Sequence, residues 1–189
     1  MQIDHAAQME TRGGAEARAP MPMGNIKLKS CWHFECRDGQ GKLKWIDQIE
    51  FNLVVNTGLD DVLDKYFKGS AYTAAHYVGL TDGTPTFAAG DTMSSHAGWT
   101  EVTAYDEANR VTPTWGSVSG QSLDNSGSPA AFTISTNNTT IGGAFLSTDN
   151  TKGGSSGTLY GGGAFSAGDK TLDDDDTLSV TVTLTASAS

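Results

Sequence analysis

The sequence predicts a mainly β protein with a sandwich or jelly-roll-like body, one amphipathic helix and an extended N-terminal arm. Gly accounts for 23 of the 189 residues, and it accompanies many Ser, Thr, Ala and Asp residues. That mix is typical of short strands joined by turns. Several segments also alternate apolar and polar residues with a period of two, as half-buried strands do. A chain of this length suits one β-rich domain with an appendage.

The first 25 residues have no hydrophobic period and contain Gly13-Gly14, Pro20 and Pro22. We therefore expect an arm over residues 1–25 that becomes ordered against a partner. The arm has no apolar signal core, and no run in the chain approaches the roughly 20 apolar residues that a membrane span requires. We expect neither export nor membrane anchoring.

A β-hairpin is expected over residues 26–50, at the start of a β-rich domain over residues 26–189. The strand begins with strict alternation at Ile26 and continues through Trp32 and Phe34, which share one face. Asp38-Gly39-Gln40-Gly41 is a turn signal, and the apolar residues that follow resume the strand.

One helix is expected over residues 57–68. Thr57 is a suitable N-cap, acidic residues occupy the first turn, and Gly69 can end the helix. The apolar residues follow helical spacing, so we expect this stripe to lie on a sheet. The stripe consists of Leu59, Val62, Leu63, Tyr66 and Phe67.

The remainder, residues 75–189, is expected to supply the sandwich strands. The last is the clearest, because its apolar residues from Leu178 to Leu184 alternate with Thr and Ser. The expected strands are 75–80, 99–105, 111–118, 131–134, 141–146, 158–165 and 177–185.

The net charge of −10 is unevenly distributed. Residues 1–56 contain seven basic and seven acidic residues, whereas residues 57–189 contain five basic and fifteen acidic residues. An acidic body without a basic stripe repels nucleic acid, so we expect no nucleic-acid partner. Lys27 and Lys29 in the balanced first part are candidates for contact with an acidic partner, or they are the outward positions of a strand.

The segment from Asp91 to Trp99 brings a carboxylate, hydroxyls and an imidazole together. Catalysis needs a base that deprotonates a nucleophile, and a third group that orients the base. Ser95 and His96 are sequence neighbours, however, so their side chains diverge. We therefore interpret the segment as a capped helical turn that Gly98 ends, and we expect no enzyme activity.

Cys31, His33 and Cys36 form a second candidate site. Their spacing lacks the second ligand pair of a zinc site. On one continuous strand the two cysteines point to opposite faces and cannot bond to each other. Two alternatives remain: two reduced thiols, or a disulfide between subunits through Cys31 or Cys36.

The four aspartates at positions 173–176 are a third candidate, because clustered carboxylates bind calcium. The run lacks the alternating frame of a calcium loop. We interpret it as a solvated turn before the last strand, and we expect no cofactor.

Residues 52–185 resemble a group of tailed-bacteriophage structural proteins. The resemblance implies a non-enzymatic component of the virion, made in the bacterial cytoplasm. It is carried by Asn52–Leu59, Tyr77–Leu80, Asp91–Trp99, Gly142–Leu146 and Asp176–Leu184.

Within the virion we expect a capsid decoration or cement protein on the outside of the head, present as a dimer or trimer. An extended arm of 25 residues reaches up to about 80 Å, far enough to contact neighbouring copies of the major capsid protein. The expected partner contacts are the arm and the first hairpin, especially Trp32, Phe34, Trp45, Lys27 and Lys29.

Three alternatives remain open. The first is a tail, neck or fibre-base protein, which would assemble into rings or tubes when purified. The second is a carbohydrate-binding or adhesin module, with Trp115 as a candidate sugar contact. The third is a hydrolase around His96.

Overall fold

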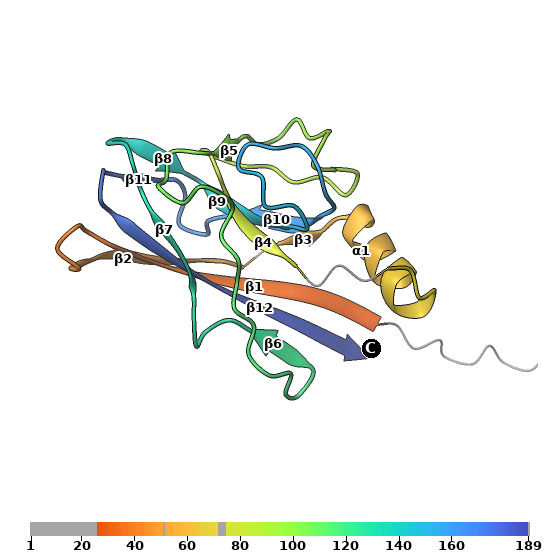
Figure 1. Ribbon diagram of the computed structural model, residues 1–189. Helices are drawn as coiled ribbons and strands as arrows, with labels where there is room; N and C mark the ends of the chain where they lie inside the picture. The colour runs from red at the N-terminus through yellow and green to blue at the C-terminus, as the bar shows by residue number, and fades with distance from the viewer. Residues whose placement is uncertain (1–25, 51, 72–74, 189) are drawn as a thin grey trace, which may run out of the picture.

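The computed structural model describes residues 26–50, 52–71 and 75–188, and the arm expected over residues 1–25 lies outside them. Strands make up 44% of the structure and helices 8%, which confirms the mainly β prediction. Two antiparallel sheets face each other, and one short helix lies at one end (Figure 1). The pairing order does not confirm the jelly-roll alternative.

The first sheet is built on a long pair of strands from the two ends of the described chain. β1 (Ile26–Arg37) pairs over its whole length with β12 (Thr177–Ala188). β2 (Leu43–Ile49) extends the sheet beyond β1, and β6 (Ser122–Asp124) and β7 (Ala130–Thr133) pair with β12. β1 and β2 correspond to the hairpin expected over residues 26–50. The Asp38 carboxylate closes its turn by accepting hydrogen bonds from the Gln40 and Lys42 N–H groups.

The second sheet has the order β3 (Leu53–Val54), β10 (Leu159–Ala164), β9 (Gly143–Ser147), β4 (Tyr77–Thr81) and β5 (Glu101–Val102). β8 (Thr139–Ile141) and β11 (Lys170–Leu172) form a separate two-stranded sheet.

Three of the expected strands differ from the observed ones. The strand expected over residues 99–105 is shortened to the two residues of β5. The strand expected over residues 111–118 is reduced to a single bridge between Val111 and Val78. The strand expected over residues 141–146 is divided at Gly142 between β8 and β9. A Cβ atom at Gly142 would lie 2.5 Å from the Asp82 carbonyl oxygen, so the chain passes between sheets at a point where a side chain would not fit.

The main core lies between the two sheets. Trp32, Phe34, Val180 and Val182 face it from the first sheet, and Val78, Leu80 and Leu146 face it from the second. A smaller core covers the other face of the second sheet and consists of Val55, Met93, Trp99, Phe145 and Leu159. β9 is therefore buried on both faces, which explains its near-continuous apolar sequence.

The expected helix is present, but its apolar stripe does not lie on the sheet. α1 (Asn56–Val62) continues into one π-helical segment, η1 (Leu63–Phe67), and Gly69 follows with a positive φ of 79°. Leu63, Tyr66 and Phe67 remain 58%, 80% and 66% exposed. The prediction of a buried stripe is therefore wrong.

The opposite side of the helix contacts the sheet through a glycine and two hydrogen bonds. A Cβ atom at Gly58 would lie 2.7 Å from the Tyr160 carbonyl oxygen, so the helix approaches β10 at backbone distance. The Tyr160 hydroxyl donates to the Asp61 carboxylate, and the Thr57 hydroxyl donates to the Leu159 carbonyl oxygen. Thr57 thus anchors the helix, and Val55 occupies the N-cap position. Within the described residues, no helix is long and apolar enough to span a bilayer.

We predict that Gly58→Ala lowers the free energy of unfolding by about 2 kcal/mol, because the helix must move away from β10 to admit the methyl group. Alanine has the higher helix propensity, so a loss reports the close approach and not the helix itself. Urea unfolding measures the effect. Gly90→Ala is the control, because nothing lies within 4 Å of a Cβ atom there, and an equal loss in both variants would contradict the prediction.

Candidate functional site

The Asp91–Trp99 segment forms a tight turn and a cover for the second sheet. The backbone N–H groups of Thr92 and Ser95 each donate to the other residue's carbonyl oxygen, and the Thr92 hydroxyl also accepts from the Ser95 N–H. The Asp91 carboxylate accepts from the Ala88 N–H. Thr92 therefore caps the turn, as expected, whereas Asp91 bonds the chain before it, and the expected helical turn is a β-turn.

The His96 side chain contacts both the ring and the carbonyl group of Trp99. The two rings stack with centroids 3.6 Å apart, and His96 Nδ1 lies 3.1 Å from the Trp99 carbonyl oxygen. These contacts, and the Asp91 contact with Ala88, differ from the base–nucleophile and base–orienter hydrogen bonds that a catalytic triad requires.

The same segment packs Trp99 against Phe145 at a centroid distance of 4.8 Å, with Met93 beside them. Gly98 allows this approach, because its Cβ atom would lie 1.9 Å from the Thr86 carbonyl oxygen. The geometry gives the segment a structural role.

We predict that His96→Ala lowers the free energy of unfolding by about 1 kcal/mol, because it removes one face of the Trp99 stack. Thermal or urea unfolding measures the loss. Ser94→Ala at the exposed tip of the same turn is the control. Unchanged stability of the His96 variant would show that the stack contributes nothing.

The two cysteines lie on opposite faces of β1, as a continuous strand requires. Cys31 is exposed and Cys36 is buried. Burial, together with the nearby Asp176 carboxylate, raises the pKa of the Cys36 thiol to about 12. In this fold the buried Cys36 cannot reach a cysteine of a second subunit. Cys31 is exposed and can still form a disulfide between subunits.

We predict that the folded chain reacts with one equivalent of a thiol reagent at pH 8, and that Cys31→Ser abolishes the reaction. A buried thiol with a raised pKa has almost no thiolate at this pH. Mass spectrometry counts the labels. Labelling of Cys36 at the rate of Cys31 would contradict the burial of β1's inner face.

The aspartate run is only partly solvated. Asp173, Asp174 and Asp175 are exposed, as expected, but Asp176 is 2% exposed. Its carboxylate accepts hydrogen bonds from the Lys44 ammonium and from the Asp173 N–H. The hydrogen bond to Asp176 raises the pKa of Lys44. Asp176 therefore connects the turn before β12 to Lys44 of β2. The described residues contain no cluster of three or more potential metal-ligand side chains.

The residues of the hairpin that were expected to contact a partner differ in their exposure. Trp32 and Phe34 are 1% and 0% exposed, so the prediction that they contact a partner is wrong: both belong to the main core. Trp45 is half-buried and packs on Phe165 at a centroid distance of 5.8 Å. Lys27 and Lys29 are exposed, and their role in partner contact stays a prediction.

Most of the exposed large apolar residues lie instead on α1 and η1, at the start of β1 or just before β6, around the end of the molecule that carries α1, which is on the right in Figure 1. We call this region the apolar end. The stripe on α1 and η1 is one part of it. Its exposed large apolar residues are Ile26, Leu59, Leu63, Tyr66, Phe67 and Val118.

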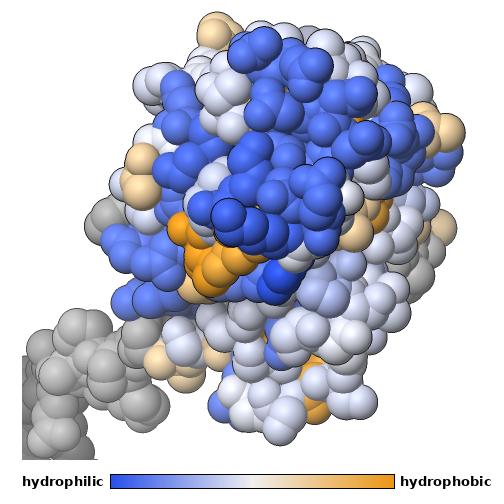
Figure 2. Space-filling view, turned by 90° about the vertical axis from the view of Figure 1, so that its left-hand side faces the viewer, coloured by the Kyte–Doolittle hydropathy of each residue, from blue (hydrophilic) through white to orange (hydrophobic). Residues whose placement is uncertain are grey.

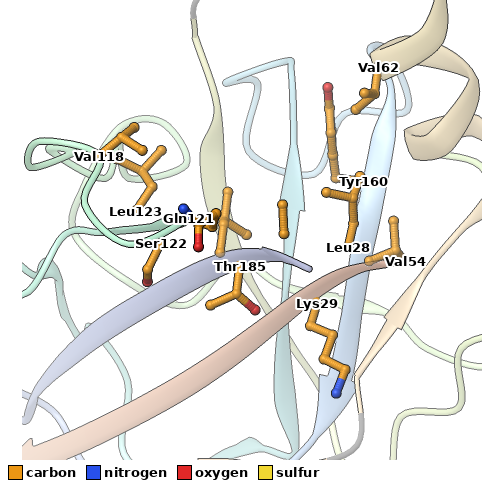
Figure 3. Close-up of a pocket in the computed structure, with 12 residues that line it drawn as sticks. Leu28, Lys29, Val54, Val62, Val118, Gln121, Ser122, Leu123, Tyr160 and Thr185 are labelled. Atoms are coloured by element: carbon orange, nitrogen blue, oxygen red, sulfur yellow. The ribbon is translucent and has the colours of Figure 1, made fainter. Parts of the chain in front are cut away.

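A groove of about 330 Å³ opens at the apolar end, and almost all of its lining is apolar. Leu28 and Leu184 lie on its floor, where the first sheet extends beyond the second. Val62 and Tyr160 form one wall, and Val118, with Leu123 behind it, forms the other (Figure 3).

The opposite end of the sandwich has a different surface. It carries the β1–β2 turn and faces the viewer in Figure 2, where it is largely hydrophilic with one compact apolar patch. The two ends of one acidic body therefore differ in their capacity to bury apolar area against another molecule.

Sequence reasoning missed the groove and the outward stripe for one reason. The pattern of Leu59 to Phe67 shows that the helix has an apolar side, but it does not show which side faces the sheet. Gly58 and Asp61, on the other side of the helix, were the available signals, because a small residue permits backbone contact.

Trp115, the candidate sugar contact, is half-buried and packs against the main core. Comparisons of the chain with protein-family models, curated proteins and solved structures give no match.

Proposed function

We propose that the chain is a non-enzymatic structural protein of a tailed-bacteriophage virion, most specifically a decoration or cement protein on the outside of the head. The observation that carries the proposal is the apolar end. Tyr66 and Phe67, at 80% and 66% exposure, are large aromatic side chains of the kind that anchor protein interfaces.

The charge distribution supports a position away from the packaged DNA. The chain carries a net charge of −10, and the acidic excess lies in residues 57–189, which contribute strands to both sheets. Such a body is repelled by nucleic acid and stays soluble when it faces water. A concentration of exposed apolar side chains at one end of an acidic body suits a protein that docks in a fixed orientation on a large surface.

The resemblance to phage structural proteins supplies the kind of partner, namely the major capsid protein. The structure changes the expected contact surface. Because Trp32 and Phe34 are buried, we assign docking to the helix stripe, with the N-terminal arm as the second contact.

We predict that Tyr66→Ser/Phe67→Ser weakens binding to heads of the encoding phage by at least about tenfold, because two exposed aromatic anchors are lost. Substitutions at exposed positions change stability by less than about 0.5 kcal/mol, so the fold should be unchanged. Binding is measured by co-sedimentation with heads that lack the protein.

The matched control is Thr103→Ser/Thr114→Ser, which alters exposed positions outside the stripe. Equal binding of the stripe variant and the wild type would remove the docking role of the helix. Absence of the chain from purified virions would overturn the virion proposal itself. Rings or tubes formed by the purified chain would favour the tail or neck alternative.

A further inference from the structure

We propose that the apolar groove and the adjoining edge of β1 form a strand-acceptor site, and that the residues from Pro20 to Met23 of the same chain fill it. The proposal goes beyond a role in the virion and is independent of it. It rests on the direction of backbone groups in β1, on the position of the groove, and on the sequence just before Ile26.

The first half of β1 has one strand neighbour among the described residues. β2 pairs with β1 only from Trp32 to Arg37. β12 pairs with β1 along the other side from Ile26 onward. The side chain of Asn52 donates to the Ser30 hydroxyl, which marks where the chain leaves β2 for the second sheet. The edge from Ile26 to Lys29 is therefore open.

The direction of the β12 backbone groups fixes what the open edge presents. The Val182 N–H and the Val180 carbonyl oxygen bond the side chain of Asn125, and the Ala186 N–H bonds the Gln121 carbonyl oxygen. Even-numbered residues of β12 thus point their backbone groups away from β1.

Backbone direction alternates along a strand, so the odd-numbered residues of β12 bond β1. Their partners in β1 are Lys27 and Lys29. It follows that Ile26 and Leu28 direct their N–H and C=O groups at the open edge.

The same two residues face the groove. Leu28 lines the groove, and Ile26, two positions away on the same face, is 73% exposed. Lys29 extends from the opposite face of β1 (Figure 3). A strand added at this edge therefore needs apolar side chains at the positions that pair with Ile26 and Leu28. The residues of the added strand that lie between these positions would direct their backbone N–H groups away from β1 and into solvent. A residue without an N–H group is therefore tolerated there.

The sequence before Ile26 meets both requirements. Residues 20–25 read Pro-Met-Pro-Met-Gly-Asn, and Gly-Asn is a two-residue hairpin connection. This connection sets Met23 opposite Ile26 and Met21 opposite Leu28. Both methionines then face the groove, and methionine adapts well to irregular apolar space.

The prolines fall at the intervening positions. Pro22 would lie opposite Lys27 and Pro20 opposite Lys29, where the missing N–H groups would face outward. Proline is tolerated at such positions and protects a sheet edge from further pairing. A two-residue connection also costs little loop entropy, so the segment of the same chain is favoured over that of a second copy.

The test is amide hydrogen exchange by NMR on the full chain, without any partner. We expect the Ile26 and Leu28 amides to exchange at least about tenfold more slowly in the wild type than in Met21→Asp/Met23→Asp. The Lys27 and Lys29 amides, which bond β12, should stay protected in both and so report that the sheet is intact. Gln8→Asp/Met9→Asp adds the same charge outside the proposed strand and should behave like the wild type. Equal exchange of Ile26 and Leu28 in all three proteins would overturn the proposal.

A cross-link distinguishes the donor chain. In a Cys31→Ser background, Pro22→Cys/Lys27→Cys places two thiols at a non-hydrogen-bonded pair with Cα atoms about 4.5 Å apart, within disulfide range. We expect a disulfide within the monomer, formed faster than in Pro22→Cys/Lys29→Cys. Disulfide-linked dimers, or equal rates in the two variants, would overturn the assignment to the same chain and register. Neither result depends on binding to phage heads.

Discussion

The pairing of β1 with β12 is the constraint on which the rest of the structure depends. Twelve residue pairs join the two ends of the described chain, from Ile26 with Ala188 to Arg37 with Thr177. Because side chains alternate along each strand, this register directs Trp32 and Phe34 to one face together with Val180 and Val182. A shift of one residue would turn the apolar residues of one of the two strands to solvent while those of the other stayed in the core. The register also determines which backbone groups of β1 remain free, and therefore the nature of the open edge.

The second sheet depends on loops that are fixed by buried polar contacts. Arg110 is 2% exposed, and its guanidinium donates to both carboxylate oxygens of Glu101 and to the carbonyl oxygens of Asp149 and Gly154. A buried charge is tolerated only when it is paired in this way. On the same sheet, the Asp91–Trp99 segment covers the outer face through Trp99. The Asp91–Trp99 residues, which suggest catalysis in the sequence, thus hold a loop against the second sheet.

The functional picture follows from an asymmetry between the two ends of the sandwich. The first sheet is longer than the second, so part of its inner face extends beyond the core and forms the floor of the groove. The helix leaves its apolar stripe exposed beside this groove, because Gly58 brings its other side to β10. The proposed docking stripe and the proposed strand-acceptor site are neighbouring parts of this one end. They serve different purposes, since one contacts a partner and the other accepts a segment of the same chain.

The sequence by itself determined the β class, the first hairpin, the last strand, the existence of the helix and the opposite orientation of Cys31 and Cys36. All of these follow from local periodicity and turn chemistry, which depend on residues close together in the chain. Tertiary structure alone decided three matters: the direction of the helix stripe, the burial of Trp32 and Phe34, and the division of residues 139–147 between two sheets at Gly142. These depend on close approaches between segments far apart in the sequence, such as Gly58 to Tyr160 and Gly142 to Asp82. An apolar pattern shows that a face is apolar, but only the packed partner decides whether that face is covered.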